Sequence, residues 1–221
     1  MNVAVLASGQ GSNLQALLDA CGGPASSAVI ALVVSNKPDA GALARAAARG
    51  VPVATIADDG QDADALLALL RGRAIDLVVL AGYLKRVPGT VVRAYRGRML
   101  NIHPALLPSF GGPGMYGRRV HEAVLRSGAR VSGATVHLVD EQYDHGEIVA
   151  QWPVPVRPDD TPQTLAARVL AVEHRLLPAV VLTLARCGAA SRLGPTPEVL
   201  DAIARLPHPA LPRSLDDALA A

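Results

Sequence analysis

The segment VAVLASGQGSNLQALLDA, residues 3–20, has the pattern of a buried strand, a glycine-containing turn and a helix. Residues 3–7 form a short continuous apolar run, as strands buried on both faces do. Residues 13–20 repeat apolar side chains at helical spacing. A strand that leads through such a turn into a helix is the first unit of a doubly wound α/β sheet, where ligands bind at the carboxyl ends of the strands.

The same alternation continues to about residue 102. Further strands are predicted at residues 28–34, 51–57, 76–81 and 99–102, and helices at 40–50 and 62–73. Two later runs, 131–140 and 147–156, alternate apolar and polar side chains as strands with one solvated face do. The chain is therefore predicted to be an α/β protein with a doubly wound, open, mostly parallel sheet and an antiparallel edge.

A long C-terminal helix is predicted over residues 161–188. Thr161 is the expected N-cap, Pro162 suits the first helical position, and Gly188 is the expected stop signal. Pro178 lies inside this helix and is expected to kink or split it, because proline lacks the backbone donor.

Composition limits the classes of function. Of 221 residues, 50% are hydrophobic and 18% are charged, which is enough apolar material for a substantial core. The net charge of +2 suits small anionic substrates, and no basic block of the kind found in nucleic-acid-binding proteins is present. Cys21 and Cys187 lack the spacing of a zinc site or a disulfide framework. No metal is predicted.

The sequence shows no pattern that would place it in a membrane or export it. The N-terminal residues read as a strand rather than a secretory leader. The longest apolar run, residues 179–185, is far shorter than the ~20 residues that a transmembrane helix needs. We expect a soluble, cytoplasmic protein that binds neither nucleic acid nor membranes.

The turn at residues 7–15 is the first candidate for chemistry. Gly9 and Gly11 permit a tight turn, and Ser12, Asn13 and the free amides of the helix start can bind an anion. The turn is no Walker loop, and Leu14 stands where the dinucleotide fingerprint has its third glycine. A monophosphate is the predicted ligand. The alternative is a turn that merely connects strand and helix.

Asn101 and His103 form the second candidate. Both lie at the end of a central strand, and alternation puts them on the same side. An asparagine amide can donate to a developing oxyanion, and a histidine can move a proton or stabilise the same oxygen. The alternative is a histidine that is only hydrogen-bonded at a strand end.

The acidic turn at residues 139–149 is the third candidate. A carboxylate beside His103 would raise the pKa of the imidazole, and Asp144 is the candidate for this role. The alternative is an ordinary solvated turn. The other histidines of the chain that lack partners at metal-ligand spacing are predicted to be structural: His121, His137, His174 and His208.

These motifs resemble, in order from residue 1 to about residue 188, the folate-dependent phosphoribosylglycinamide formyltransferase family of purine biosynthesis. The segments that carry the resemblance are SGQGSNLQ, VLAGYLKRV, LNIHPALLPSF, GATVHLVDEQYDHGEIVAQ and VEHRLLP. The resemblance implies a Rossmann-like formyltransferase fold in one domain, residues 1–188. A phosphate-binding half would span about 1–102 and a folate and catalytic half about 103–188, with residues 189–221 as a C-terminal extension.

The family passes the formyl group of 10-formyltetrahydrofolate to the glycine amine of phosphoribosylglycinamide. These two small molecules would be the chain's substrates, and the resemblance allows a homodimer. It implies a catalytic trio of Asn101, His103 and Asp144. It assigns the substrate phosphate to Gly11, Ser12 and Asn13, and the glycinamide to Gly82, Pro104 and Glu173. It assigns folate to Leu84, Lys85, Arg86, Val87, Asn101, Val139, Asp140, Glu141 and Asp144.

The chain departs from its relatives at two places. Residues 58–65 are acidic where relatives carry an arginine that holds folate, and Pro113 in the loop 109–117 stands where relatives often have lysine. Three alternatives are weighed against the transferase. A formyltetrahydrofolate deformylase would carry an extra N-terminal domain, a methionyl-tRNA formyltransferase would need a further C-terminal domain, and a non-catalytic nucleotide-binding module would not need the trio.

Overall fold

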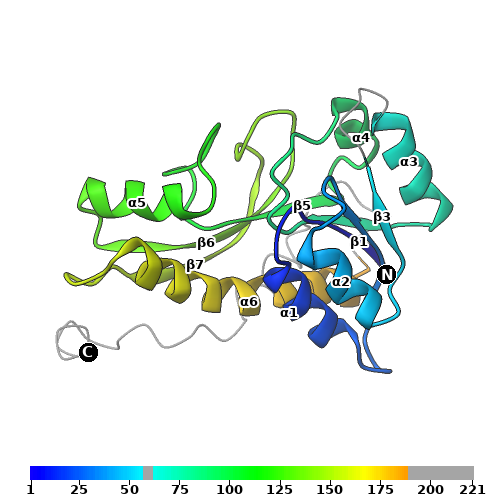
Figure 1. Cartoon of the computed structure of the whole chain (residues 1–221), viewed down its shortest axis with the longest axis horizontal. Coiled ribbons are helices and arrows are strands. Elements are labelled where there is room, and N and C mark those ends of the chain that lie inside the picture. Colours follow the sequence, from blue (N-terminus) through cyan, green and yellow to red (C-terminus); the bar gives the residue numbers. More distant parts are fainter. Residues whose placement is uncertain (57–61, 189–221) are drawn as a thin grey trace.

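The computed structural model describes residues 1–56 and 62–188, and its centre is a seven-stranded sheet in the order β3-β2-β1-β4-β5-β6-β7 (Figure 1). The strands are β1 (Asn2–Leu6), β2 (Val29–Ser35), β3 (Val53–Thr55), β4 (Leu77–Leu80), β5 (Met99–His103), β6 (Val131–Leu138) and β7 (Ile148–Pro155). The helices are α1 (Ser12–Cys21), α2 (Gly41–Ala48), α3 (Asp62–Gly72), α4 (Gly89–Ala94), α5 (Arg118–Ser127) and α6 (Pro162–Arg186).

The strands β1 to β5 run parallel, while β6 and β7 are antiparallel to their neighbours. The chain moves outward from β1 to β3 and then returns to place β4 on the other side of β1. The crevice beyond the carboxyl ends of β1 and β4 is therefore the topological switch point, where open α/β sheets bind ligands.

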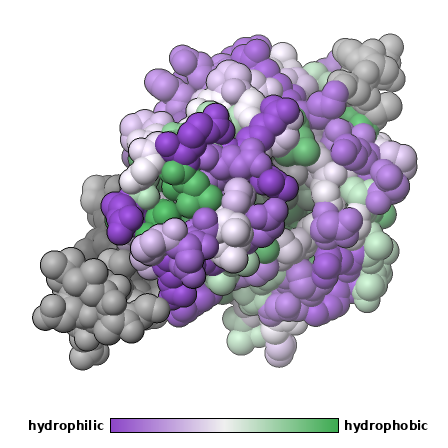
Figure 2. Space-filling view, turned by 60° about the vertical axis from the view of Figure 1, so that its left-hand side comes forward, coloured by the Kyte–Doolittle hydropathy of each residue, from purple (hydrophilic) through white to green (hydrophobic). Residues whose placement is uncertain are grey.

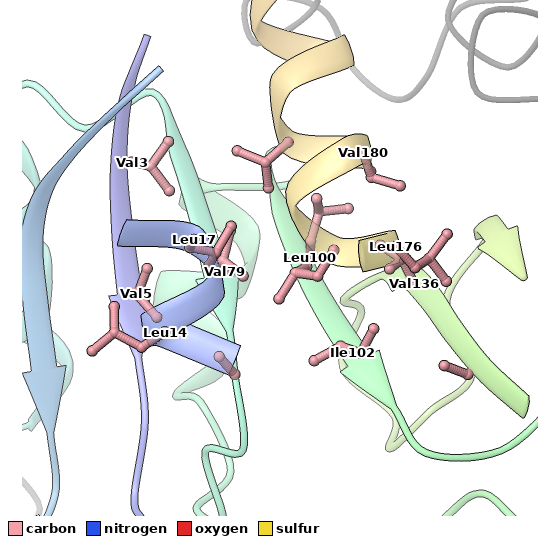
Figure 3. Packing of buried hydrophobic residues seen from close by; sticks show 14 of the residues in the cluster. Val3, Val5, Leu14, Leu17, Val79, Leu100, Ile102, Val136, Leu176 and Val180 are labelled. Atoms are coloured by element: carbon pink, nitrogen blue, oxygen red, sulfur yellow. The ribbon is translucent and has the colours of Figure 1, made fainter. Parts of the chain in front are cut away.

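Two apolar layers cover the sheet because alternate residues of each buried strand point to opposite faces. Val3 and Val5 of β1 belong to the layer that α1 and α6 cover. In Figure 3 they lie by Leu14 and Leu17 of α1, while Leu176 and Val180 of α6 lie by Val136 and Leu100. Ala4 and Leu6, the other face of the same strand, pack with α3 and α4. Burial on both faces explains why these strands are continuous apolar runs in the sequence.

Helix α6 begins as predicted. Thr161 is its N-cap, with a capping box in which the Thr161 side chain accepts from the Thr164 amide and the Thr164 hydroxyl accepts from the Thr161 amide. Pro178 does not split the helix, which runs unbroken from Pro162 to Arg186. Pro178 is one of the buried residues of the helix, and this packing outweighs the lost hydrogen bond.

The structure confirms the predicted fold class, and every predicted strand and helix has a counterpart within a few residues. Helices α4 and α5 were not predicted as elements; α4 has only six residues, and α5 follows the loop 109–117. In the described parts of the chain, no helix is both long and apolar enough to cross a membrane. Figure 2 shows a largely hydrophilic face on which apolar side chains gather in separate patches. The predicted extension, residues 189–221, lies outside the described residues.

Candidate active site

A cavity of about 580 Å³ lies at the carboxyl ends of β4 and β5. Most of the predicted site residues line it: Asn13, Gly82, Leu84, Lys85, Arg86, Val87, Asn101, His103, Pro104, Val139, Asp140, Glu141, Asp144 and Glu173. Gly11 and Ser12 lie beside Asn13 at the start of α1. Sequence positions from 13 to 173 therefore meet in one place, as the switch-point argument predicts.

The turn before α1 is held tightly against α2. Gly11 is the N-cap residue of α1 with a φ of 75°, and a Cβ at this position would lie 2.7 Å from the Ala42 Cα. The Ala42 amide donates to the Gly9 carbonyl at 3.1 Å, and Arg45 Nε donates to the Gln10 carbonyl at 2.8 Å. The glycine is therefore required for close packing, and the first amides of α1 stay available for an anion.

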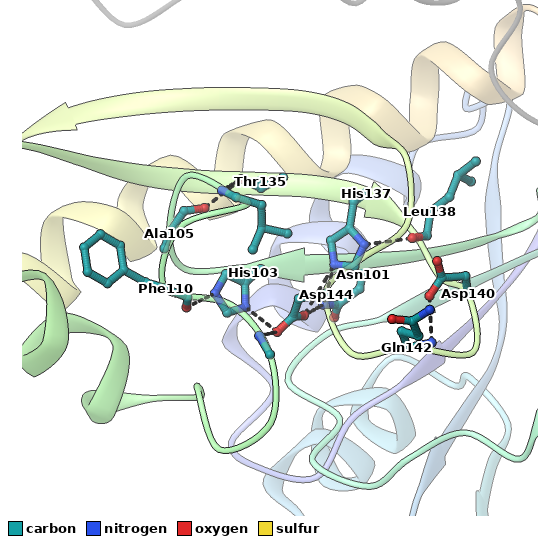
Figure 4. A network of polar contacts seen from close by, with 12 residues as sticks. Asn101, His103, Ala105, Phe110, Thr135, His137, Leu138, Asp140, Gln142 and Asp144 are labelled. Carbon is teal, nitrogen blue, oxygen red and sulfur yellow. Dashed lines mark hydrogen bonds and ion pairs between the residues drawn. The ribbon is translucent and has the colours of Figure 1, made fainter.

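Asn101 and His103 lie on the same side of β5, as alternation predicts, and both face Asp144 (Figure 4). Asn101 Nδ2 donates to Asp144 Oδ1 at 3.3 Å, and His103 Nδ1 lies 3.5 Å from Asp144 Oδ2. Asp144 adopts a φ of 54° in the turn between β6 and β7, and its Oδ2 also accepts from the Gly112 amide at 2.9 Å. The loop 109–117 and the acidic turn thus meet at this carboxylate.

The pKa of His103 shifts in the opposite direction to the sequence interpretation. Burial lowers the pKa below its ordinary value and outweighs Asp144 and the Phe110 carbonyl, which both raise it. His103 is only 3% exposed, so desolvation of its charged form is the larger effect. Asp144 does raise the pKa as expected, but burial has the larger effect, so the free site favours the neutral imidazole.

Both ring nitrogens of His103 face protein oxygens. Nε2 donates to the Phe110 carbonyl at 2.9 Å, and Nδ1 faces Asp144. Burial alone would raise the pKa of Asp144, but attraction to His103 and the hydrogen bond from the Gly112 amide hold it below its ordinary value. Asp144 is therefore an ionised carboxylate placed to stabilise His103 whenever that imidazole gains a proton.

His137 belongs to the same cluster, although sequence reasoning assigned it a structural role. It lies opposite Asn101 in the pairing of β5 with β6, and its Nε2 is 3.0 Å from Asn101 Nδ2 and 3.6 Å from Asp144 Oδ1. The alternation of the strand around His137 was visible in the sequence. Its register against β5 was not, and that register brings the imidazole to the trio.

His121 was also predicted to be structural, and the structure places it on the wall of the same cavity. Its side chain is buried on the inner face of α5, and Nδ1 has no hydrogen-bond partner there. Burial, reinforced by repulsion from His103, lowers the pKa of His121. An uncharged imidazole therefore faces the cavity beside the catalytic candidates.

Glu173 lies at the end of the cavity nearest to the glycine turn. Its carboxylate is 7% exposed and accepts from Asn13 Nδ2 at 2.6 Å. Burial raises the pKa of Glu173 to about 7, and the bond from Asn13 opposes this only in part. A carboxyl that changes its charge near neutral pH thus lies beside the predicted phosphate loop.

Replacing Glu173 by glutamine should stabilise the protein at alkaline pH. Between the ordinary pKa of 4.5 and about 7, the unfolded chain releases the proton while the native carboxyl keeps it, so native stability falls with rising pH. Glutamine removes this penalty, which corresponds to about 3 kcal/mol. Urea unfolding should show this gain at pH 8 and none at pH 4. The exposed Glu147→Gln variant should show no gain at either pH, and an equal gain for Glu173→Gln at both would contradict the assignment.

The predicted folate segments come from two loops that contact each other. Arg86 donates to the Glu141 carbonyl at 2.6 Å, and Arg96, which was not predicted, pairs with the Glu141 carboxylate at 3.1 Å. On the other side, the Leu84 amide donates to Ser8 Oγ at 2.9 Å. The segment 84–87 is therefore anchored both to the end of β1 and to the acidic turn.

Two sequence departures fall in or near this site. Pro113 lines the cavity together with Gly112, Gly114, Met115 and Tyr116 of the loop. The acidic segment 58–65 lies partly outside the described residues, which resume at Asp62. Across residues 1–56 and 62–188, no three His, Cys, Asp or Glu side chains form a group that could hold a metal ion.

Comparison with known proteins agrees with this geometry. Residues 1–181 match the family model described as formyl transferase. The chain is 39% identical over 184 residues to phosphoribosylglycinamide formyltransferase of Haemophilus influenzae. This alignment covers 81% of this chain and 84% of that protein. It is 46% identical to the chloroplastic enzyme of Arabidopsis thaliana over 81% of this chain. The chain spans 63% of the length of that plant relative and 59% of the one from Vigna unguiculata.

Solved structures give the same result. The crystal structure of phosphoribosylglycinamide formyltransferase from Anaplasma phagocytophilum has a TM-score of 0.79 at 38% identity, over 84% of this chain and 87% of that chain. The one from Brucella melitensis has a TM-score of 0.75 at 42% identity, over 86% and 96%. The chain therefore belongs to the formyl transferase family and, within it, to the phosphoribosylglycinamide formyltransferases.

Proposed function

We propose that the protein transfers the formyl group of 10-formyltetrahydrofolate to the glycine amine of phosphoribosylglycinamide. The observation that carries the proposal is the cluster of Asn101, His103 and Asp144 on the wall of one cavity. One end of that cavity offers the turn at Asn13 and the carboxyl of Glu173. The other end is formed by residues 84–87 and 139–144.

The two ends of the cavity suit the two substrates. The amides at the start of α1, with Gly11, Ser12 and Asn13, would bind the ribose phosphate, since helix N-termini favour anions. Gly82, Pro104 and Glu173 would contact the glycinamide. The folate ring would lie against the apolar floor and the loop backbone, and the floor is made of Leu80, Val87, Val92, Ile102 and Val139.

The residues of the trio supply what acyl transfer needs. The amine nitrogen forms a bond to the formyl carbon, and Asn101 donates to the oxygen that becomes negative. For this step neutral His103 carries its proton on Nδ1, toward Asp144, so that Nε2, turned away from the Phe110 carbonyl, accepts the proton that the attacking nitrogen loses. Asp144 stabilises the resulting imidazolium. His103 then returns the proton to the folate nitrogen as its bond to the formyl carbon breaks, so His103 ends as it began.

A deformylase is the competing function, because water could replace the amine at the same trio. The end of the cavity formed by Asn13 and Glu173 favours the transferase, because a hydrolase that uses water as the acceptor would not need a turn that binds phosphate. A nucleotide-binding module without activity would not need the trio. The proposal also includes a cytoplasmic location and a homodimeric state.

The test is a spectrophotometric assay of folate product from a 10-formylfolate donor, with and without phosphoribosylglycinamide. The transferase requires turnover only when the glycinamide is present. Turnover with the donor alone identifies a deformylase. Binding of both molecules without turnover identifies the binding module.

A further inference from the structure

We infer that His137 is a positioning residue for Asn101: its Nε2 accepts from the Asn101 amide and keeps the amide nitrogen turned toward the reacting carbonyl. The inference rests on the proposed function, because that carbonyl is the formyl group. The two side chains lie side by side on β5 and β6, and His137 is 2% exposed (Figure 4). A buried imidazole makes its contacts in one fixed geometry, unlike a surface residue.

The tautomer of His137 follows from its second contact. Nδ1 lies 2.7 Å from the Leu138 carbonyl oxygen, which can only accept, so Nδ1 carries the proton. A neutral imidazole with the proton on Nδ1 has a lone pair on Nε2. The atom 3.0 Å from that lone pair, Asn101 Nδ2, must therefore be a donor.

The orientation of the Asn101 amide follows from the same reasoning on both sides. Asp144 is ionised, and its Oδ1, 3.3 Å from the amide nitrogen, can only accept. A flipped amide would place its oxygen against the His137 lone pair and the Asp144 carboxylate at once. Both neighbours therefore select the same orientation, with the nitrogen toward the carboxylate.

The two bonds differ in what they can do during the reaction. The bond to Asp144 is the longer one, and Asp144 also turns its charge to His103 when that imidazole is protonated. The amide hydrogen that no longer points at Asp144 can then form a hydrogen bond to the formyl oxygen. The bond to His137 does not involve a reacting group and can persist throughout, so it keeps the amide from flipping once the bond to Asp144 has opened.

The matched variants are His137→Gln and His137→Asn. Glutamine can place an acceptor near the position of Nε2, whereas asparagine reaches only as far as Nδ1. His137→Asn should lower kcat about 10-fold with KM changed less than about twofold, and His137→Gln should recover most of this loss. In an Asn101→Ala background, His137→Asn should add no further loss, because its effect acts through Asn101.

Equal losses for the two His137 variants, or losses that multiply with that of Asn101→Ala, would overturn the inference in favour of a packing role. A measurement on the unaltered protein covers the case in which a variant does not fold. Nitrogen-15 NMR of the histidine side chains should show the His137 proton on Nδ1, and a proton on Nε2 of the neutral ring overturns the inference. If the wild-type assay shows no formyl transfer, the proposed function fails while this NMR result still decides the contact.

Discussion

Replacing His103 by alanine should lower kcat about 10³-fold or more, with little change in KM for either substrate. The imidazole is proposed to take the proton from the attacking amine and to return it to the folate nitrogen, and such general acid–base catalysis is typically worth about 10²-fold to 10⁴-fold. His103 is 3% exposed and contacts Phe110 and Asp144, so it offers little surface to the bound substrates. Its loss should therefore affect the chemical step and spare binding.

The pH dependence separates this role from a structural one. Because burial lowers the pKa of His103, activity should rise with pH as the imidazole loses its proton, and the midpoint of kcat/KM should lie below 6.5. From the sequence, Asp144 was expected to raise the pKa of His103, so this direction of the pH dependence is the opposite of what that expectation implies. The acid limb should be absent in the residual activity of His103→Ala.

Calorimetric titration with phosphoribosylglycinamide supplies the control for His103→Ala, since a folded variant should bind with a wild-type Kd. A variant that binds normally and retains more than a tenth of kcat would remove His103 from the proposed mechanism. A wild-type profile that falls between pH 5 and 7 would instead show that the protonated imidazole of His103 is the active form.

The fold was predictable because its determinants are local. Strands buried on both faces are continuous apolar runs, and Gly11 marks a turn whose packing against Ala42 leaves no room for a side chain. Alternation along one strand placed Asn101 and His103 together. These predictions need only neighbours in sequence, and the structure confirms the fold and the convergence on Asp144.

What escaped prediction depends on distances between segments. His137 reaches Asn101 through the register of two antiparallel strands, which turn geometry and packing determine. The pKa of His103 depends on how completely the protein buries it, and sequence showed only the attractive partner Asp144. Pro178 lies in an intact helix because contacts remote in sequence hold it there. The sequence therefore predicted the direction in which Asp144 shifts the pKa of His103, but not that the effect of burial is larger.

Replacing Asp144 by asparagine should lower kcat about 10²-fold. The carboxylate accepts from Asn101 and Gly112 and faces His103, so three elements of the site meet at one charge. Asparagine is similar in size but cannot stabilise the imidazolium, and removal of an opposite charge disfavours the protonated form. Its amide would also present a donor to groups that now donate, which should disorder Asn101.

The same substitution has a signature in stability. Because the folded pKa of Asp144 is lowered, the carboxylate contributes stability above its ordinary pKa of 3.8, and this contribution disappears as pH falls through the folded value. Asp144→Asn should therefore be less stable than wild type in urea at pH 7, and the difference should shrink toward pH 3. The variant Glu147→Gln on the same turn is the control and should match wild type in rate and stability.

A single outcome would count against the central place of Asp144. If Asp144→Asn kept wild-type kcat while losing stability at pH 7, the carboxylate would serve only to hold the loop 109–117 against the turn. If instead kcat falls and the pKa of His103, followed by NMR, falls further below its wild-type value, the carboxylate acts through the imidazole. That second result ties Asp144 to the proton transfer. The charge of Asp144 favours imidazolium, so its removal should lower the pKa of His103.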